Sequence, residues 1–466
     1  MTSGLFRPAA VWIFFAALAY APWAYGGTTV ESIDTINCLL AAVLVLWIVD
    51  LAVSRRRPEL PRLLVIVVAA LLVIDGWMVL NAAAIFDSVF GTFSRLRQPV
   101  PHLPGSVDYA LSVASMIRCA LLLGVTLFIV DLSQDKRWLV RLWGAIAIVG
   151  GSVALLGLLQ KASGAGMIFW HPAPPGGTMT FFASYYYHGN AGAYLNLVLP
   201  LTSGLAVRSF VTGSNAGLRA LWLTIFVLTL VAVFANTART AQAIAILLLI
   251  AVSVRVGPRL LKRFSRAEKN IALAGAAAIL LALFAVAHVS HLEQPIERWG
   301  QFSENFSTDA RWLSATVALR SLPRVGLFGF GPGTFRSVFP SFNSTSAAPA
   351  PGEWRFLHDD YLQTMMEWGW IGSALWAALF FGGLIVAVRR LNSGDARDWL
   401  PRRRLLLSLV AIALAGVALH ALADFPLQIA SIQLYVATYL GMCWGSARWR
   451  SEKSEDRSQK SESADR

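Results

Sequence analysis

Apolar stretches long enough to cross a lipid bilayer recur along the whole chain, and this feature restricts the fold more than any other. A helix of about 20 apolar residues spans the roughly 30 Å hydrocarbon core of a bilayer. Twelve such stretches are predicted, near residues 9–25, 35–53, 63–81, 108–131, 138–160, 188–207, 220–236, 240–257, 271–289, 368–388, 405–424 and 427–446. The predicted fold is therefore all-α, a polytopic membrane bundle of about 12 transmembrane helices.

The composition excludes the soluble classes of protein. Only 14% of the 466 residues are charged, against about 25% in an ordinary soluble domain, and 56% are hydrophobic. The three cysteines, Cys38, Cys119 and Cys443, lie far apart in apolar stretches, so they predict neither a metal site nor a disulfide framework. The stretch after Arg7 has the form of a signal peptide but lacks a clear small-x-small cleavage site, and we interpret it as an uncleaved first span.

The basic residues predict how the chain is inserted. Of the 39 Lys and Arg residues, 28 fall in the segments that are cytoplasmic if both termini lie inside, 10 fall in outer segments, and Arg118 falls within a span. Cytoplasmic segments of membrane proteins carry such an excess of Lys and Arg. The net charge of +13 is therefore interpreted as N-in, C-in topology, and no nucleic-acid partner is predicted.

The chain is predicted to consist of four parts. An N-terminal bundle of about nine spans (residues 1–289) precedes an outer loop (290–356), which is the longest connection and carries the candidate motifs. The C-terminal helices (357–446) and a disordered cytoplasmic tail (447–466) follow. Loops as long as 290–356 are usually functional or disordered.

The long loop has its own order signals. An amphipathic helix is predicted from Asp309 to Arg320, ended by Pro323. The glycine run Gly329–Gly333 follows, without the Gly-Lys-Ser/Thr of a phosphate-binding loop. A tight turn packed by phenylalanines is the favoured interpretation, and a nest of backbone amides for an anion is the alternative.

Three arginines stand out by position. Arg239 lies in a short outer turn, where it either snorkels from a span end or is held as an anion ligand. Arg311 opens the loop helix, where a cation opposes the helix dipole, so it either pairs with Asp309 or binds a carboxylate or phosphate. Arg118 is expected to face the bundle interior or water, because an unpaired arginine within a bilayer is costly.

Two histidine motifs flank the last spans. His358 precedes Asp359, Asp360 and Tyr361 where the chain re-enters the membrane. His358 is a candidate general base, and the aspartates are candidate helix caps; both roles are compatible. The second motif is a pair, His420 and Asp424, four residues apart on one helical face. This pair either has a function or fixes a helix end.

The start of the sixth predicted span is also polar. His188 and Asn190 follow three consecutive tyrosines, residues 185–187. The tyrosines are typical of a belt at the membrane interface. The polar pair either binds sugar or caps the helix.

Segments of the region from about 187 to 428 resemble the O-antigen ligase and polymerase superfamily of bacterial membrane glycosyltransferases. The segments are Tyr187–Leu201, the Thr-Ala-Arg-Thr-Ala turn around Arg239, Arg311–Phe335, and His358–Gly369 together with His420–Leu427. The resemblance implies a GT-C-like enzyme of the bacterial inner membrane. It would transfer a glycan from polyprenyl (undecaprenyl) pyrophosphate to an acceptor at the periplasmic face, with no metal or other cofactor.

The resemblance leaves several activities open. An O-antigen ligase of lipopolysaccharide or surface polysaccharide biosynthesis is the first expectation, with lipid A-core as acceptor. An O-antigen or exopolysaccharide polymerase, with a glycan acceptor, and a protein O-oligosaccharyltransferase are alternatives. A transporter of lipid-linked saccharides is the alternative from another class. A single in-line displacement at the anomeric carbon would invert its configuration.

The resemblance also implies roles for individual residues. Arg239 and Arg311 would hold the pyrophosphate, and His358 would act at the acceptor hydroxyl. The residues expected to contact substrate are His188, Asn190, Asp359, Asp360, Tyr361, Arg118, His420 and Asp424. The superfamily more often has Asn where this chain has Asp359, and a carboxylate there would either stabilise a charged histidine or repel pyrophosphate.

Overall fold

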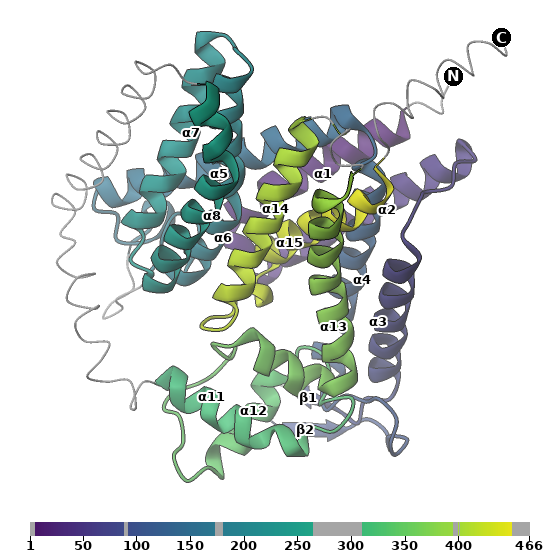
Figure 1. The fold of residues 1–466 in the computed structure, drawn as a ribbon. Coiled ribbons are helices and arrows are strands. Elements are labelled where there is room, and N and C mark those ends of the chain that lie inside the picture. The colour runs from purple at the N-terminus through teal and green to yellow at the C-terminus, as the bar shows by residue number, and fades with distance from the viewer. Residues whose placement is uncertain are drawn as a thin grey trace.

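The computed structural model describes residues 5–87, 92–172, 180–263, 310–394, 399 and 401–449. Within these ranges nine helices are long and apolar enough to span a membrane. They are α2 (Val30–Val53), α3 (Arg62–Leu80), α4 (Tyr109–Leu132), α5 (Lys136–Ala162), α6 (His188–Val211), α7 (Ala216–Ala235), α8 (Arg239–Arg263), α13 (Asp360–Asn392) and α14 (Pro401–His420). The chain is thus a polytopic bundle of apolar helices (Figure 1).

Two further helices, α1 (Phe6–Trp23) and α15 (Ala430–Gly445), coincide with predicted spans and pack inside the bundle. The predicted span 271–289 and nearly all of the predicted tail lie outside the described residues. One element was not predicted: between α3 and α4 the strands β1 (Ala84–Asp87) and β2 (Thr92–Arg95) form an antiparallel hairpin.

Short polar side chains begin five of these helices. Thr29, Asp108, Asp135, Asn215 and Asp359 each accept a hydrogen bond from a backbone N–H in the first turn of α2, α4, α5, α7 and α13. Such caps satisfy amide groups that have no partner within the helix. The sequence therefore sets where these helices begin, and with them the positions of the side chains that precede each helix.

The centre of the bundle is formed by α6 and α15, which are buried along nearly their whole length. Tyrosine hydroxyls join them: Tyr194 donates to the hydroxyl of Tyr435 (3.2 Å), and Tyr439 donates to the carbonyl of Leu197 (3.0 Å). Tyr435 in turn donates to the carbonyl of Leu18 in α1 (3.1 Å). Buried polar groups need such partners, and these bonds fix the relative positions of three helices.

The described part of the long loop forms a separate layer on one end of the bundle, at the bottom of Figure 1. It contains α11 (Ala310–Ser321), the short helix η4 (Leu322–Arg324) and α12 (Phe335–Ser344). These elements have their own small core, in which Val317, Phe335, Phe339, Leu357 and Met366 are buried. We call this end, where α6 and α13 begin and α14 ends, the loop end.

The glycine run Gly329–Gly333 packs against α13 at Gly369, where the helix is interrupted. Gly329 and Gly369 both have positive φ angles (77° and 63°), and a Cβ on either would overlap the backbone around the other. The amides of Phe330 and Gly331 donate to carbonyls of α13 before the break, and the amide of Ile371 donates back to the loop. The tight turn favoured from the sequence is therefore clamped onto α13, which fixes the loop layer to the bundle.

Candidate functional site

Four segments that are far apart in the sequence meet at the loop end. Tyr187 precedes α6, Arg311 lies in the first turn of α11, His358 precedes α13, and Asp424 follows α14. Their side chains form a continuous chain of hydrogen bonds, from Arg311 through Tyr187 and Asp424 to His358. We refer to these four residues as the site chain.

The carboxylate of Asp424 fixes the histidine. Nδ1 of His358 lies 2.8 Å from Oδ1 of Asp424, whose side chain is 3% exposed. A carboxylate only accepts hydrogen bonds, so Nδ1 carries the proton and Nε2 of the neutral imidazole has the lone pair. Among the described residues Nε2 has no hydrogen-bond partner, and the side chain is 17% exposed. Nε2 is thus available to an incoming group.

The other carboxylate oxygen connects Asp424 to the arginine. The hydroxyl of Tyr187 donates to Oδ2 of Asp424 (2.9 Å) and accepts from Nη2 of Arg311 (2.8 Å). Burial, followed by the charge of Asp424, raises the pKa of Tyr187, so its phenol remains a donor. Burial acts to raise the pKa of Asp424, but the hydrogen bond from His358 and the nearby His420 and Arg311 outweigh it and hold that pKa below its ordinary value.

Aromatic rings surround the imidazole of His358. Phe425, Trp354 and Tyr187 all contact it edge-on, with ring centroids 4.9, 5.8 and 6.0 Å away. Phe425 also stacks on Tyr187 (5.5 Å) and on Phe356 (5.1 Å). These rings pack around the imidazole and restrict its orientation.

The turn that carries Arg239 is braced against the start of α6. The side-chain amide of Asn236 donates to the carbonyl of His188 (2.8 Å), and Oγ1 of Thr237 lies 3.4 Å from Nδ1 of His188. The imidazole of His188 stacks on Tyr187 with ring centroids 5.1 Å apart. The structure therefore places Arg239, the first residue of α8, at the loop end, joined to the site chain through His188.

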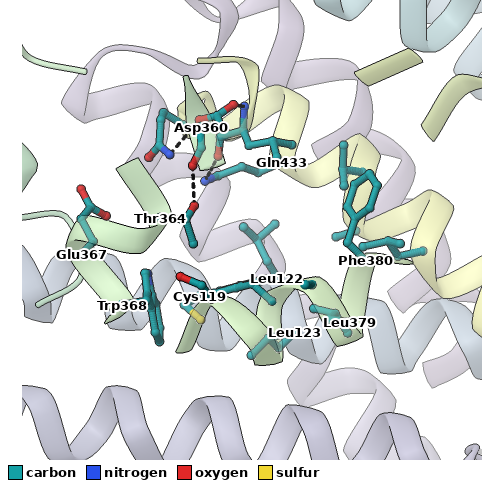
Figure 2. A pocket seen from close by; sticks show the side chains of 18 of the residues that line it. Cys119, Leu122, Leu123, Asp360, Thr364, Glu367, Trp368, Leu379, Phe380 and Gln433 are labelled. Carbon is teal, nitrogen blue, oxygen red and sulfur yellow. Dashed lines mark hydrogen bonds between the residues drawn. The ribbon is translucent and has the colours of Figure 1, made fainter. Parts of the chain in front are cut away.

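A cavity with a volume of about 360 Å³ lies between α4, α13 and α15. Asp360 and Tyr361 line it, so it begins beside the helix start that carries His358. Figure 2 shows Asp360, Thr364 and Gln433 along its polar wall, and Leu122, Leu123 and Leu379 along an apolar wall. The cavity is mostly apolar with a polar mouth, which suits an amphipathic ligand.

Part of the chain is similar to a known protein family. Residues 224–377 match the family model described as O-antigen ligase. This stretch is similar to O-antigen ligases. It contains Arg239, Arg311 and His358, and it supports the resemblance to the ligase and polymerase superfamily seen in the sequence. No curated protein sequence matches the chain at a significant level.

The O-antigen ligase stretch ends before Asp424 and begins after Tyr187. Two of the four residues of the site chain therefore come from outside it, from the helices that pack around it. The match supports an enzyme of the O-antigen ligase or polymerase type. The segment before α6 and the connection between α14 and α15 contribute Tyr187 and Asp424 to the site chain.

The residues that follow His358 hold the site together. Oδ1 of Asp359 accepts from the amides of Tyr361 and Leu362 (3.0 Å each), so it caps α13. Asp360, which is 1% exposed, accepts from the amide of Leu427 (2.8 Å) and from the side chain of Gln428 (2.9 Å). These contacts hold the start of α13 beside the segment that contains Asp424.

Tyr361 and His420 contact the same region of α14. The hydroxyl of Tyr361 donates to the carbonyl of Ala418 (2.8 Å). His420 is 1% exposed, and its Nε2 lies 4.0 Å from Oδ2 of Asp424. The hydrogen bonds of Asp424 go to His358 and Tyr187 rather than to His420. The predicted pair is therefore adjacent, with His358 as the principal partner of the carboxylate.

Arg118 and Asn190 occupy different surroundings. Arg118 lines the cavity, within electrostatic range of Glu367. Asn190 lies in the first turn of α6 at 4% exposure, and its Oδ1 has no hydrogen-bond partner among the described residues. Arg118 thus faces a hollow of the bundle, as expected of an arginine within a span.

Sequence reasoning missed Glu367. Its carboxylate accepts from the amides of Gly333 (3.0 Å) and Phe335 (3.2 Å) and from the side chain of Gln363 (3.1 Å). Within the glycine run the amide of Gly333 is thus occupied by this carboxylate, and those of Phe330 and Gly331 by carbonyls of α13. A glutamate directly before the span predicted near 368–388 was the available signal, because a carboxylate next to a membrane span is expected to have a partner.

Sequence reasoning also missed the role of Tyr187. The interfacial belt predicted for the three tyrosines is wrong for Tyr185, which is fully buried and shares a hydrogen bond with Ser431 (3.1 Å). Tyr186 stacks on Tyr25 instead. A Cβ on Gly189 would lie 2.5 Å from Oδ2 of Asp424, so the glycine of the His-Gly-Asn motif allows α6 to approach the carboxylate.

Proposed function

We propose that the protein transfers a glycan from a polyprenyl pyrophosphate carrier to an acceptor hydroxyl, as an O-antigen ligase does. The site chain is the observation that carries this proposal. It connects a cation suited to pyrophosphate, Arg311, to a histidine with an available Nε2, His358, through hydrogen bonds of 2.8, 2.9 and 2.8 Å. A transfer reaction of this kind needs these two groups next to one another.

The proposed reaction is a single displacement. Nε2 of His358 accepts the proton of the acceptor hydroxyl, whose oxygen attacks the anomeric carbon. The bond between that carbon and the pyrophosphate oxygen breaks, and polyprenyl pyrophosphate leaves with the electron pair. Attack opposite the leaving group inverts the anomeric configuration. Asp424 stabilises the imidazolium that forms, as a buried carboxylate does beside a catalytic histidine.

Arginines supply the positive charge for the leaving group. A guanidinium group is permanently charged and can form two parallel hydrogen bonds to a phosphate. In the proposal Arg311 contacts the pyrophosphate directly and Arg239 contacts it from the start of α8. Arg311 keeps its bond to Tyr187, whose contact with Asp424 couples pyrophosphate binding to the position of His358.

The cavity supports a lipid-linked donor. Its apolar walls, formed by α4, α13 and α15, provide a place for part of an isoprenoid chain. In the proposal the carrier lipid enters this cavity, and Arg118 and Gln428 at the polar mouth face the pyrophosphate side. In the proposal the other residues predicted to contact substrate hold His358 and Asp424 in position. They are His188, Asn190, Asp359, Asp360, Tyr361 and His420.

The location is part of the same proposal. The excess of basic residues in alternate segments supports an N-in, C-in orientation in the inner membrane, with the loop end at the periplasmic face. Lipid-linked glycans are then the activated donors at that face. The four parts predicted from the sequence, 1–289, 290–356, 357–446 and 447–466, follow this topology.

A pair of arginine variants tests the proposal. Arg311→Ala should abolish glycan transfer while the protein still inserts into the membrane. Arg324→Ala is the matched control, because Arg324 is an exposed arginine of the same loop layer. Full transfer by the Arg311 variant would overturn the assignment of Arg311 as the pyrophosphate ligand.

A deletion strain identifies the acceptor class. Long glycans that accumulate on the carrier lipid would support the ligase. Accumulated single repeats would point to a polymerase, and loss of glycan from protein would point to a protein O-oligosaccharyltransferase. Unchanged lipid-linked and transferred glycans would contradict transferase activity altogether.

A further inference from the structure

The opposite end of the bundle has a second hollow, with a volume of about 620 Å³. It lies where α1, α3, α5 and α14 begin and α2 and α4 end, and thus at the end of α14 opposite to Asp424. Six basic residues line it: Arg7, Arg56, Arg57, Lys136, Arg137 and Arg402. They come from four separate segments, so the fold brings them together.

The acidic side chains around this hollow have structural partners. Asp131 accepts from Nη2 of Arg56 (2.8 Å) and from the indole N–H of Trp47 (3.1 Å). Asp50 also contacts Arg56 (3.4 Å), and Asp135 caps α5. Glu59 also lines the hollow, so three acidic and six basic side chains line it, and three positive charges remain in excess.

Four of the lining arginines have no carboxylate partner in the described part of the chain: Arg7, Arg57, Arg137 and Arg402. Nε of Arg402 is buried without a hydrogen-bond partner there. Arg402 also lies close enough to Arg208 to repel it. Like charges held together in this way repel one another, and an anion between them would relieve that repulsion.

The start of α5 places further cations at the hollow. Arg137 lies in the first turn of this 27-residue helix, and amides of this turn already donate to Asp135. An anion in the hollow would therefore be attracted chiefly by the basic side chains. The preference for basic residues in cytoplasmic segments explains the number of cations at this end, but not why they converge on one hollow.

We propose that this hollow binds the phosphate headgroup of an anionic phospholipid. Exposed apolar side chains next to the hollow favour a lipid over a free anion. Trp12 of α1 is 59% exposed and contacts Trp138 of α5 edge-on at 6.2 Å, and Leu63 of α3 is 58% exposed. These side chains give the acyl chains a surface directly beside the cations that hold the phosphate.

The test uses the full-length protein purified in a neutral detergent and titrated with phosphatidylglycerol, with bound lipid counted by native mass spectrometry. The variant pair Arg57→Gln with Arg402→Gln should weaken lipid binding by about tenfold or more, since each basic residue near a lipid surface contributes on the order of fivefold. The matched control pair is Arg62→Gln with Arg389→Gln, two exposed arginines at the same end that do not line the hollow.

Three outcomes decide the proposal. Loss of binding in the first pair but not in the control pair supports it. Equal loss in both pairs would show a diffuse charge effect and overturn it. Thermal stabilisation of the wild-type protein by inorganic phosphate as large as that by phosphatidylglycerol would show a free-anion site instead. If Arg402→Gln does not fold, Arg7→Gln with Arg57→Gln makes the same comparison.

Discussion

Replacing Asp424 by Asn tests how much the negative charge of Asp424 contributes to the site chain when the shape of the side chain is kept. Oδ1 accepts from two N–H groups, Nδ1 of His358 and the backbone amide of Phe425 (3.1 Å), while Oδ2 accepts from the hydroxyl of Tyr187. An asparagine should therefore place its carbonyl oxygen at the Oδ1 position. Its NH₂ group would face the hydroxyl of Tyr187, which already accepts from Arg311 and would lose Asp424 as the acceptor of its own O–H. The tautomer of His358 is then preserved.

The expected loss follows from this arrangement. A hydrogen bond to a charged group is worth about 1–2 kcal/mol more than a neutral one, which corresponds to roughly 5- to 30-fold in rate. Asp424→Ala also removes the acceptor that fixes Nδ1, so it should lose most of the factor of about 100 or more that a positioned general base contributes. Glycan transfer should therefore be highest in the wild type, lower in Asp424→Asn and lowest in Asp424→Ala.

The assay complements a deletion strain with each variant at matched protein levels in the membrane. The ratio of transferred to carrier-linked glycan is then measured. Asp34→Asn, the same change at an exposed carboxylate of α2, is the control and should match the wild type. Transfer by Asp424→Asn within twofold of the wild type, or equal transfer by Asp424→Asn and Asp424→Ala, would refute the reasoning.

Three further outcomes are expected. Asp359→Asn should keep wild-type stability and transfer because Asn caps a helix as well as Asp, whereas Asp359→Ala should lower the free energy of unfolding by about 1 kcal/mol in thermal or denaturant unfolding. Glu367→Ala should cost about 3 kcal/mol in the same measurement, because two buried amides lose their acceptor. The pKa of Asp424 is held below its ordinary value of 3.8, so its charge contributes stability that is lost as pH falls through that range. The difference in unfolding free energy between wild type and Asp424→Asn should thus shrink as pH falls below about 4, and an unchanged difference there would contradict this.

Helix positions could be predicted because hydropathy and capping residues act locally. The described spans lie within several residues of the predicted ones, and the helix predicted from Asp309 to Arg320 corresponds to α11. Asp309 itself lies outside the described residues, so its predicted pairing with Arg311 stays a prediction. The predicted span starts near residue 368, whereas α13 starts at Asp360. The interruption at Gly369 separates this additional helical segment from the span.

The partners within the site could not be predicted, because they depend on how distant helices pack. The spacing of His420 and Asp424 indicated a local pair, but Asp424 bonds to His358, 66 residues earlier in the chain. Tyr187 looked like one of three equivalent tyrosines until packing separated them. Glu367 was not considered because the amides that it accepts from lie more than 30 residues away in the sequence.

Chemical rescue of His358 tests the proposed mechanism most directly. His358→Ala should lose glycan transfer and recover part of it when free imidazole, which can occupy the space left beside Asp424, is added to membranes that contain the variant. Arg311→Ala should not respond to imidazole, because its missing group is a cation rather than a base. Undiminished transfer by His358→Ala without imidazole would contradict the account.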